Sequence, residues 1–136
     1  MRLQKQPAFL LGQNPAVGSA HGRLQRLGMA NLDWLVVRDL YETESAAFWR
    51  NSPEVQSGEL SPAAIKTEVF FLPCAASMEK EGSISNSGRW AQWRYKAQNP
   101  LGQSKPDGDI MVELFNEIRS AYKKPGGAFP DPILKL

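Results

Sequence analysis

Residues 7–15, PAFLLGQNP, hold the pattern that decides the fold. Ala8 to Leu11 form a short apolar run, Gly12 ends it, and Asn14-Pro15 turns the chain before a segment with helical spacing. A buried strand that stops at a glycine-containing turn before a helix is typical of the first unit of an open α/β sheet. In such sheets, ligands bind beyond the carboxyl ends of the strands. A plain strand–helix unit without a ligand also fits, because a single glycine is weaker than a full dinucleotide fingerprint.

Strands and helices alternate along the rest of the chain. Two more apolar strands are predicted over 34–37 and 67–72, and continuous apolar strands suit a parallel sheet covered on both faces. Helices are predicted over 19–28, with Ser19 as the N-cap, and over 43–49. The order predicts a three-layer α/β fold of dinucleotide-binding-like form, with a mainly parallel sheet of about four or five strands.

The remaining segments complete one predicted domain over residues 1–123. The apolar stripe of an amphipathic helix over 110–122 is expected to face the core, with Asp107 or Asp109 as its cap. The polar stretch 51–66 is interpreted as an excursion outside the core, and 83–93 as an irregular loop or small hairpin. Residues 124–136 lack periodicity and are interpreted as a linker toward a region beyond this chain.

Composition excludes several functional classes. The chain has 136 residues, 42% hydrophobic and 22% charged, which suits one globular domain. A net charge of +2 without a dense basic patch argues against nucleic acid as a partner. Cys74 and His21 stand alone, so an internal disulfide and a Cys/His zinc or iron–sulfur site are excluded. Cys74 is therefore interpreted as a small buried side chain. No apolar run approaches the roughly 18 residues of a membrane span.

Four motifs follow one another along the chain. They are GQNPAVGSAHGRLQR at 12–26, NLDWLVVRDLYETESAAFW at 31–49, TEVFFLPCAASMEKEGSISNSGRWAQWRYKA at 67–97 and NPLGQSKPDGD at 99–109. In this order they resemble the molybdopterin-dependent oxidoreductases, and within them the large subunits of respiratory formate dehydrogenases. The resemblance covers about residues 8–122, and the run TEVFFLP after an inserted excursion favours the formate dehydrogenases.

The resemblance assigns cofactor-binding roles that elementary chemistry supports. Asn14 would contact the dinucleotide, since its amide can donate and accept beside a diphosphate. Asp39, at the end of the second strand with Arg38, can bind ribose hydroxyls, although a helix cap explains it equally well. Lys80 would supply positive charge. Asp107 would accept two hydrogen bonds from guanine, which adenine cannot offer. Without the resemblance, Lys80 is a solvated charge and Asp107 a helix cap. The full set is Gly12, Asn14, Arg38, Asp39, Lys80 and Asp107.

The resemblance also implies what surrounds this segment. The parent enzyme would oxidise formate to carbon dioxide and pass electrons onward. It would hold molybdenum or tungsten on two pterin guanine dinucleotides, together with a [4Fe–4S] cluster outside this segment. Expected partners are the rest of the large subunit and an iron–sulfur electron-transfer subunit. The expected location is the periplasm, with the export signal elsewhere, or alternatively the cytoplasm.

This segment is expected to hold one dinucleotide and to contribute no catalytic residue or metal ligand. The 136-residue chain alone should therefore be inactive with formate. Two alternatives remain open. One is a free-standing nucleotide-binding or scaffold module without catalysis. The other is a folded α/β piece that cannot bind the dinucleotide without its neighbours.

Overall fold

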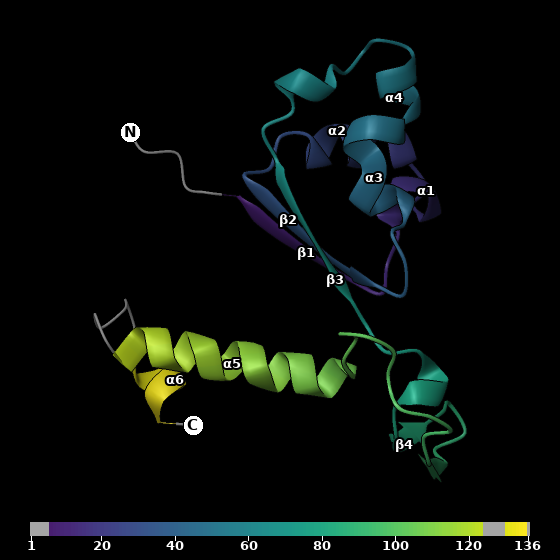
Figure 1. The fold of residues 1–136 in the computed structure, drawn as a ribbon, viewed down its shortest axis with the longest axis vertical. Helices are drawn as coiled ribbons and strands as arrows, with labels where there is room; N and C mark the ends of the chain where they lie inside the picture. Colours follow the sequence, from purple (N-terminus) through teal and green to yellow (C-terminus); the bar gives the residue numbers. More distant parts are fainter. Residues whose placement is uncertain (1–5, 124–129, 136) are drawn as a thin grey trace. The chain divides into compact units, whose positions relative to one another are not determined.

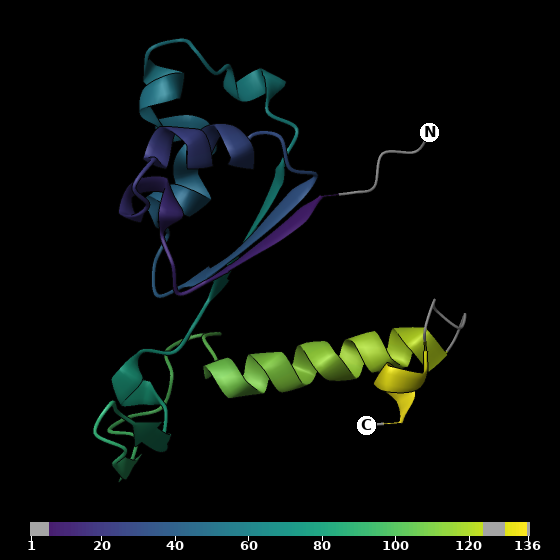
Figure 2. The same cartoon turned by 180° about the vertical axis from the view of Figure 1, so that it is seen from behind.

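The computed structural model describes residues 6–123 and 130–135. These fall into two compact units, Met1–Cys74 and Ala75–Leu136, hereafter unit 1 and unit 2. Figures 1 and 2 draw the chain from opposite sides. The predicted single domain over 1–123 and the predicted linker over 124–136 stay predictions, and residues 124–129 and 136 lie outside the described part.

Unit 1 is built on three parallel strands in the order β1-β2-β3. They are β1 (Pro7–Leu11), β2 (Trp34–Asp39) and β3 (Glu68–Pro73), so all three predicted strands are confirmed to within two residues. The predicted count of four or five is wrong for the described residues. The other two strands there, β4 (Gly82–Ser85) and β5 (Ala91–Arg94), pair with each other as an antiparallel hairpin.

Short helices connect the strands of unit 1. The predicted helix over 19–28 is confirmed as α2 (Gly22–Met29), which starts three residues later with His21 instead of Ser19 as its N-cap. A separate short helix, α1 (Pro15–Gly18), precedes it. Pro15 has a backbone angle suited to a first helical turn, so a helix starts directly after Asn14. Ser19 is extended and ends α1 instead of capping a longer helix. The second predicted helix is confirmed as α3 (Glu44–Asn51), with Thr43 at its N-cap.

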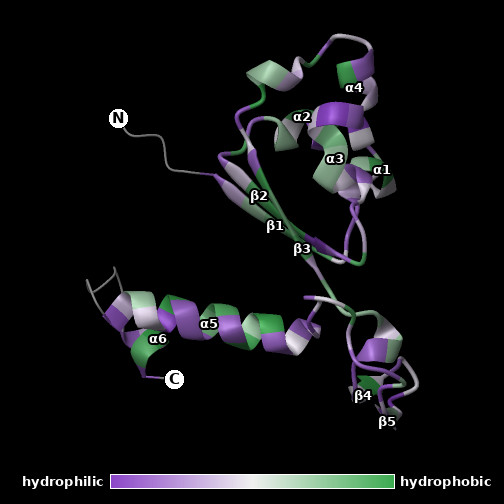
Figure 3. Cartoon of the chain, in the orientation of Figure 1, coloured by the Kyte–Doolittle hydropathy of each residue, from purple (hydrophilic) through white to green (hydrophobic). Residues whose placement is uncertain are grey.

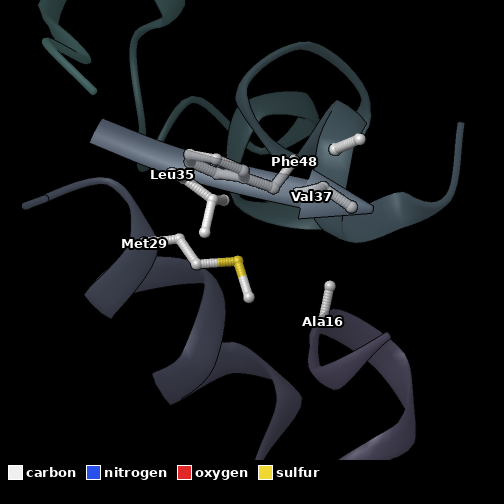
Figure 4. Close-up of a cluster of buried hydrophobic side chains, with 6 residues drawn as sticks. Ala16, Met29, Leu35, Val37 and Phe48 are labelled. Atoms are coloured by element: carbon white, nitrogen blue, oxygen red, sulfur yellow. The ribbon is translucent and has the colours of Figure 1, made fainter. Parts of the chain in front are cut away.

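The core of unit 1 lies between the sheet and these helices. Strand β2 contributes Leu35 and Val37, both fully buried, and α3 contributes Phe48. In Figure 4, Met29 of α2 and Ala16 of α1 belong to the same cluster and face the side chains of β2. Because successive side chains of a strand point to opposite faces, only alternate residues of β2 reach this core.

The second face of the sheet carries four exposed apolar side chains on its outer strands. The helices of unit 1 lie on one side of its sheet in both views (Figures 1 and 2). On the other side, Phe9 aligns with Phe70, and Leu11 aligns with Leu72, each pair across β2. These four side chains are 43–50% exposed. The described part of unit 1 therefore has one helical layer, and the three-layer arrangement stays a prediction.

The excursion carries its own short helices, α4 (Pro53–Gln56) and the 3-10 turn η1 (Pro62–Ala64). Val55, Leu60 and Ile65 are not buried, as expected for a surface segment, although Ile65 packs against the core. Glu54 differs, since this carboxylate is only 3% exposed. A charged residue this deeply buried needs a partner.

Unit 2 contains the 3-10 turn η2 (Ser77–Glu79), the β4–β5 hairpin, α5 (Asp107–Lys123) and α6 (Asp131–Leu134). The hairpin confirms one of the two alternatives for 83–93. Helix α5 confirms the predicted amphipathic helix, and apolar and hydrophilic bands alternate along it in Figure 3. The prediction that its stripe forms core is wrong, since no residue of α5 is buried. The helix starts at Asp107, so this residue lies in the first turn and not before it.

Gly22 is required for a close approach at the start of α2. A Cβ atom at this position would lie 2.7 Å from the Ala16 carbonyl oxygen and 2.9 Å from Nη1 of Arg26. We expect Gly22→Ala to lower the free energy of unfolding by about 1–3 kcal/mol, as overpacking does. Gly28→Ala is the matched control, because it lies in the same helix with open space around it. It should stabilise by about 0.5–1 kcal/mol. Equal urea midpoints for the two variants would contradict this account.

Candidate functional site

The carboxyl end of the sheet in unit 1 brings together Gly12, Arg38 and Asp39. Gly12 takes a φ of 64°, a conformation that favours glycine, and its N–H donates to the Arg38 carbonyl at 2.8 Å. Asp39 ends β2, and its Oδ1 accepts from the Leu40 N–H at 2.8 Å. The Asp39 carboxylate thus stabilises the turn that follows β2. Its side chain is half-buried at the edge of the sheet where a ligand is expected.

Asn14 lies just beyond this edge and is held by α3. Its Oδ1 accepts from the Ser45 N–H at 3.1 Å and from the Ser45 hydroxyl at 2.7 Å. Its Nδ2 donates to the Glu44 carboxylate at 2.6 Å. Ser45 is fully buried and its Oγ also accepts from the Ala16 N–H at 3.1 Å. The turn after β1 is therefore fixed to the start of α3 by side chains that the sequence analysis did not single out.

A second set of contacts fixes the same turn from the other side. Arg26 of α2 makes two hydrogen bonds to Glu54, each of 2.7 Å, and donates a further one to the Ala16 carbonyl. The Arg26 hydrogen bond holds the pKa of Glu54 well below its usual range, at about 2, and Glu54 raises the pKa of Arg26. Residues 28 apart in sequence form this pair, so no local pattern could have revealed it.

A cavity of about 320 Å³ adjoins these contacts, close to the chain that leaves β2. Thr43 lines it and is only 7% exposed, and its buried hydroxyl oxygen makes no hydrogen bond to the described residues. An unsatisfied buried hydroxyl is uncommon in folded proteins. The wall residues are Val17, Arg26, Tyr41, Glu42, Thr43, Glu44, Ala47, Asn51, Ser52 and Pro53.

Unit 2 brings Lys80 and Asp107 into an ion pair. Their side chains remain 32% and 45% exposed, so both can still meet a ligand. The segment before Lys80 is anchored by Glu79, which is 6% exposed and accepts from the Ala76 N–H at 2.8 Å. The sequence motifs named both members of the pair without indicating that they contact each other.

The predicted site residues have the chemistry that a nucleotide needs. An amide and a carboxylate lie at the sheet edge of unit 1, and an amine and a carboxylate are paired in unit 2. These groups supply donors and acceptors for hydroxyls, phosphates and a base edge. Across residues 6–123 and 130–135, no three His, Cys, Asp or Glu side chains are grouped so that they could hold a metal ion. The described residues thus offer groups that suit the nucleotide part of a cofactor.

Comparison with known proteins finds relatives that share most of this chain's length. The chain is 44% identical to formate dehydrogenase subunit alpha of Megalodesulfovibrio gigas over 94% of its length. The chain is homologous to one segment of formate dehydrogenase large subunits. Formate dehydrogenase 2 subunit alpha (cytochrome c-553) of Nitratidesulfovibrio vulgaris matches at 46% over the same share, and the nitrate-inducible formate dehydrogenase major subunit of Escherichia coli at 37%. The chain spans 12% of the length of each of these relatives.

No family model matches the chain. None of the helices in the described residues is long and apolar enough to cross a membrane.

The Arg26–Glu54 pair makes the stability of unit 1 depend on pH. The pKa of Glu54 is lowered in the folded state, so its contribution is complete above the unfolded value of 4.5 and is lost as pH falls toward about 2. We expect Glu54→Gln to cost about 3 kcal/mol at pH 7 and almost nothing near pH 2. Urea unfolding of the 136-residue chain across this range measures the difference.

Glu59→Gln is the control for this experiment, because Glu59 forms an exposed ion pair with Arg23 in the same unit. Exposed pairs of this kind contribute about 0–1 kcal/mol, so the control should behave like the wild type at every pH. A Glu54→Gln effect that is the same at pH 2 and pH 7 would show that the ionised pair is not its cause.

Proposed function

We propose that this chain is the part of a formate dehydrogenase large subunit that holds one pterin guanine dinucleotide. The homology with formate dehydrogenase large subunits supports the parent enzyme. The observation that carries the binding role is the Lys80–Asp107 pair, in which two residues far apart in sequence, both named by the family motifs, come into contact. Gly12, Asn14, Arg38 and Asp39 would supply further contacts from the sheet edge.

The proposed division of labour follows from the residue types. The metal and pterin would supply the two-electron oxidation of formate, which no group of this chain can perform. Asp107 would accept from the guanine edge, and Lys80 would hold that carboxylate in place and balance its charge. Because Lys80 already pairs with Asp107, we expect guanine to bind to a carboxylate that is oriented in advance.

The proposed partners and location come from the parent enzyme. They are the remainder of the large subunit, which would carry the metal ligand and a [4Fe–4S] cluster, and a separate iron–sulfur electron-transfer subunit. We propose a periplasmic location. The similarity to a subunit named for cytochrome c-553 supports that location, because c-type cytochromes work outside the cytoplasm of bacteria.

Asp107 variants of the full-length enzyme test the proposal. Asp107→Ala should weaken dinucleotide retention by about 1–3 kcal/mol, because guanine donors lose their acceptor. Asp107→Asn should be nearly as harmful, since an amide offers one acceptor where two are needed. The measurement is the pterin released per mole of purified protein after dialysis.

Glu113→Gln is the matched control. Glu113 lies on the same helix and pairs with Lys105 at 2.6 Å, also in an exposed position. Removing either exposed ion pair should change stability little. Dinucleotide retention that is equal in Asp107→Ala and Glu113→Gln would overturn the guanine-binding role.

A further inference from the structure

The hydrogen bonds of Asn14 fix which side of its amide faces which neighbour. The Ser45 backbone N–H can only donate, so the atom that accepts from it at 3.1 Å must be oxygen. The Glu44 carboxylate can only accept when ionised, so the atom 2.6 Å away must be nitrogen. The two contacts exclude the flipped amide, an ambiguity that distances alone rarely resolve.

Among the described residues, these contacts leave the side chain of Asn14 with a single unused hydrogen-bonding group. Both acceptor positions of Oδ1 are taken by the N–H and hydroxyl of Ser45. One of the two N–H groups of Nδ2 is taken by Glu44. The remaining N–H belongs to a side chain that is only half-buried. Asn14 can therefore offer a ligand one donor and no acceptor.

The charge beside this donor restricts what it can bind. Glu44 is exposed, and its own backbone N–H together with the Asn14 amide holds the pKa of its carboxyl below the usual range. The neighbouring Glu42 pairs with Arg50, so that cation is already engaged. A full negative charge next to the amide nitrogen repels a phosphate oxygen but not an uncharged acceptor.

We infer that Glu44 and Ser45 are positioning residues that make Asn14 a single hydrogen-bond donor for an uncharged acceptor of the dinucleotide, such as a sugar hydroxyl or a ring carbonyl. The inference rests on the proposed function. It narrows the sequence-based expectation that Asn14 both donates and accepts beside a diphosphate. The buried Ser45 hydroxyl also accepts from Ala16, so the donor is held to the same turn that Gly12 begins.

An exchange of donor and acceptor between Asn14 and Glu44 tests this inference in the full-length holoenzyme. In Asn14→Asp with Glu44→Gln, the new amide donates to the new carboxylate, and Ser45 still donates to residue 14. The hydrogen bonds that hold residue 14 to residues 44 and 45, hereafter the clamp, are restored. Residue 14 then has no side-chain N–H left for a ligand. We expect the thermal midpoint of the dinucleotide-free protein to recover relative to Asn14→Asp alone. Pterin retention should stay reduced by about tenfold.

The outcome separates a clamp from a ligand contact. If pterin retention recovers together with the thermal midpoint, Asn14 is only a clamp and the inference is wrong. Glu44→Gln alone removes the charge while it keeps a weaker acceptor for Asn14, so pterin retention should not rise. A rise of about tenfold in retention would indicate a phosphate at this position and overturn the uncharged acceptor.

Ser45→Ala keeps the experiment decisive if the double variant does not fold. It removes the hydroxyl contacts to Asn14 and Ala16 but leaves the free N–H of Asn14 in place. It should therefore lower the thermal midpoint as Asn14→Asp does, with less loss of pterin. Losses of pterin that simply follow the thermal midpoint in both variants would overturn the inference.

Two further variants complete the design. Glu59→Gln, which removes an exposed ion pair of the same unit, should change neither readout. Asp107→Ala separates the two proposals. If it lowers pterin retention while Asn14→Asp does not, only the present inference fails. If neither variant lowers retention, the proposed function fails as well.

Discussion

The guanidinium of Arg26 holds unit 1 together at the point where its helices are weakest. Helices α1 and α4 have four residues each and α2 has eight, too short to be stable in water on their own. Arg26 joins all three, through two hydrogen bonds to Glu54 and one to the Ala16 carbonyl. Such a buried pair adds modest net stability, but loss of one partner leaves an uncompensated charge. Within the excursion over 51–66, Glu54 is thus the buried carboxylate that joins this segment to α1 and α2, and Glu59 adds an exposed pair with Arg23.

The turn after β1 is held from both sides, and this explains how a short polar loop can be ordered. The Arg26 guanidinium donates to the carbonyl of Ala16, and the Ser45 hydroxyl oxygen accepts from the Ala16 N–H. Asn14 is held by the same α3 residues that follow the Thr43 cap. A loop with its polar groups already satisfied loses little entropy when a ligand arrives. The geometry around Asn14 is therefore set by residues that need not contact the ligand themselves.

Local sequence predicted the elements that depend on local chemistry. The apolar runs located three strands, and the 3.6-residue period located α5. What could not be predicted depends on distant partners. The end of α1 at Gly18, where Ser19 becomes extended, was not predicted, and the Arg26–Glu54 pair has no local signature. The same holds for the site: motif resemblance named Lys80 and Asp107, but the clamp role of Ser45 requires three-dimensional information.

The uncovered face of the sheet has a practical consequence. Phe9 and Leu11 on β1, and Phe70 and Leu72 on β3, are exposed apolar side chains on the outer strands of the described sheet. Open strand edges beside exposed apolar side chains promote sheet-to-sheet association between copies. In concentrated solution, the isolated chain should therefore associate through this face more readily than a chain in which the same four positions are polar.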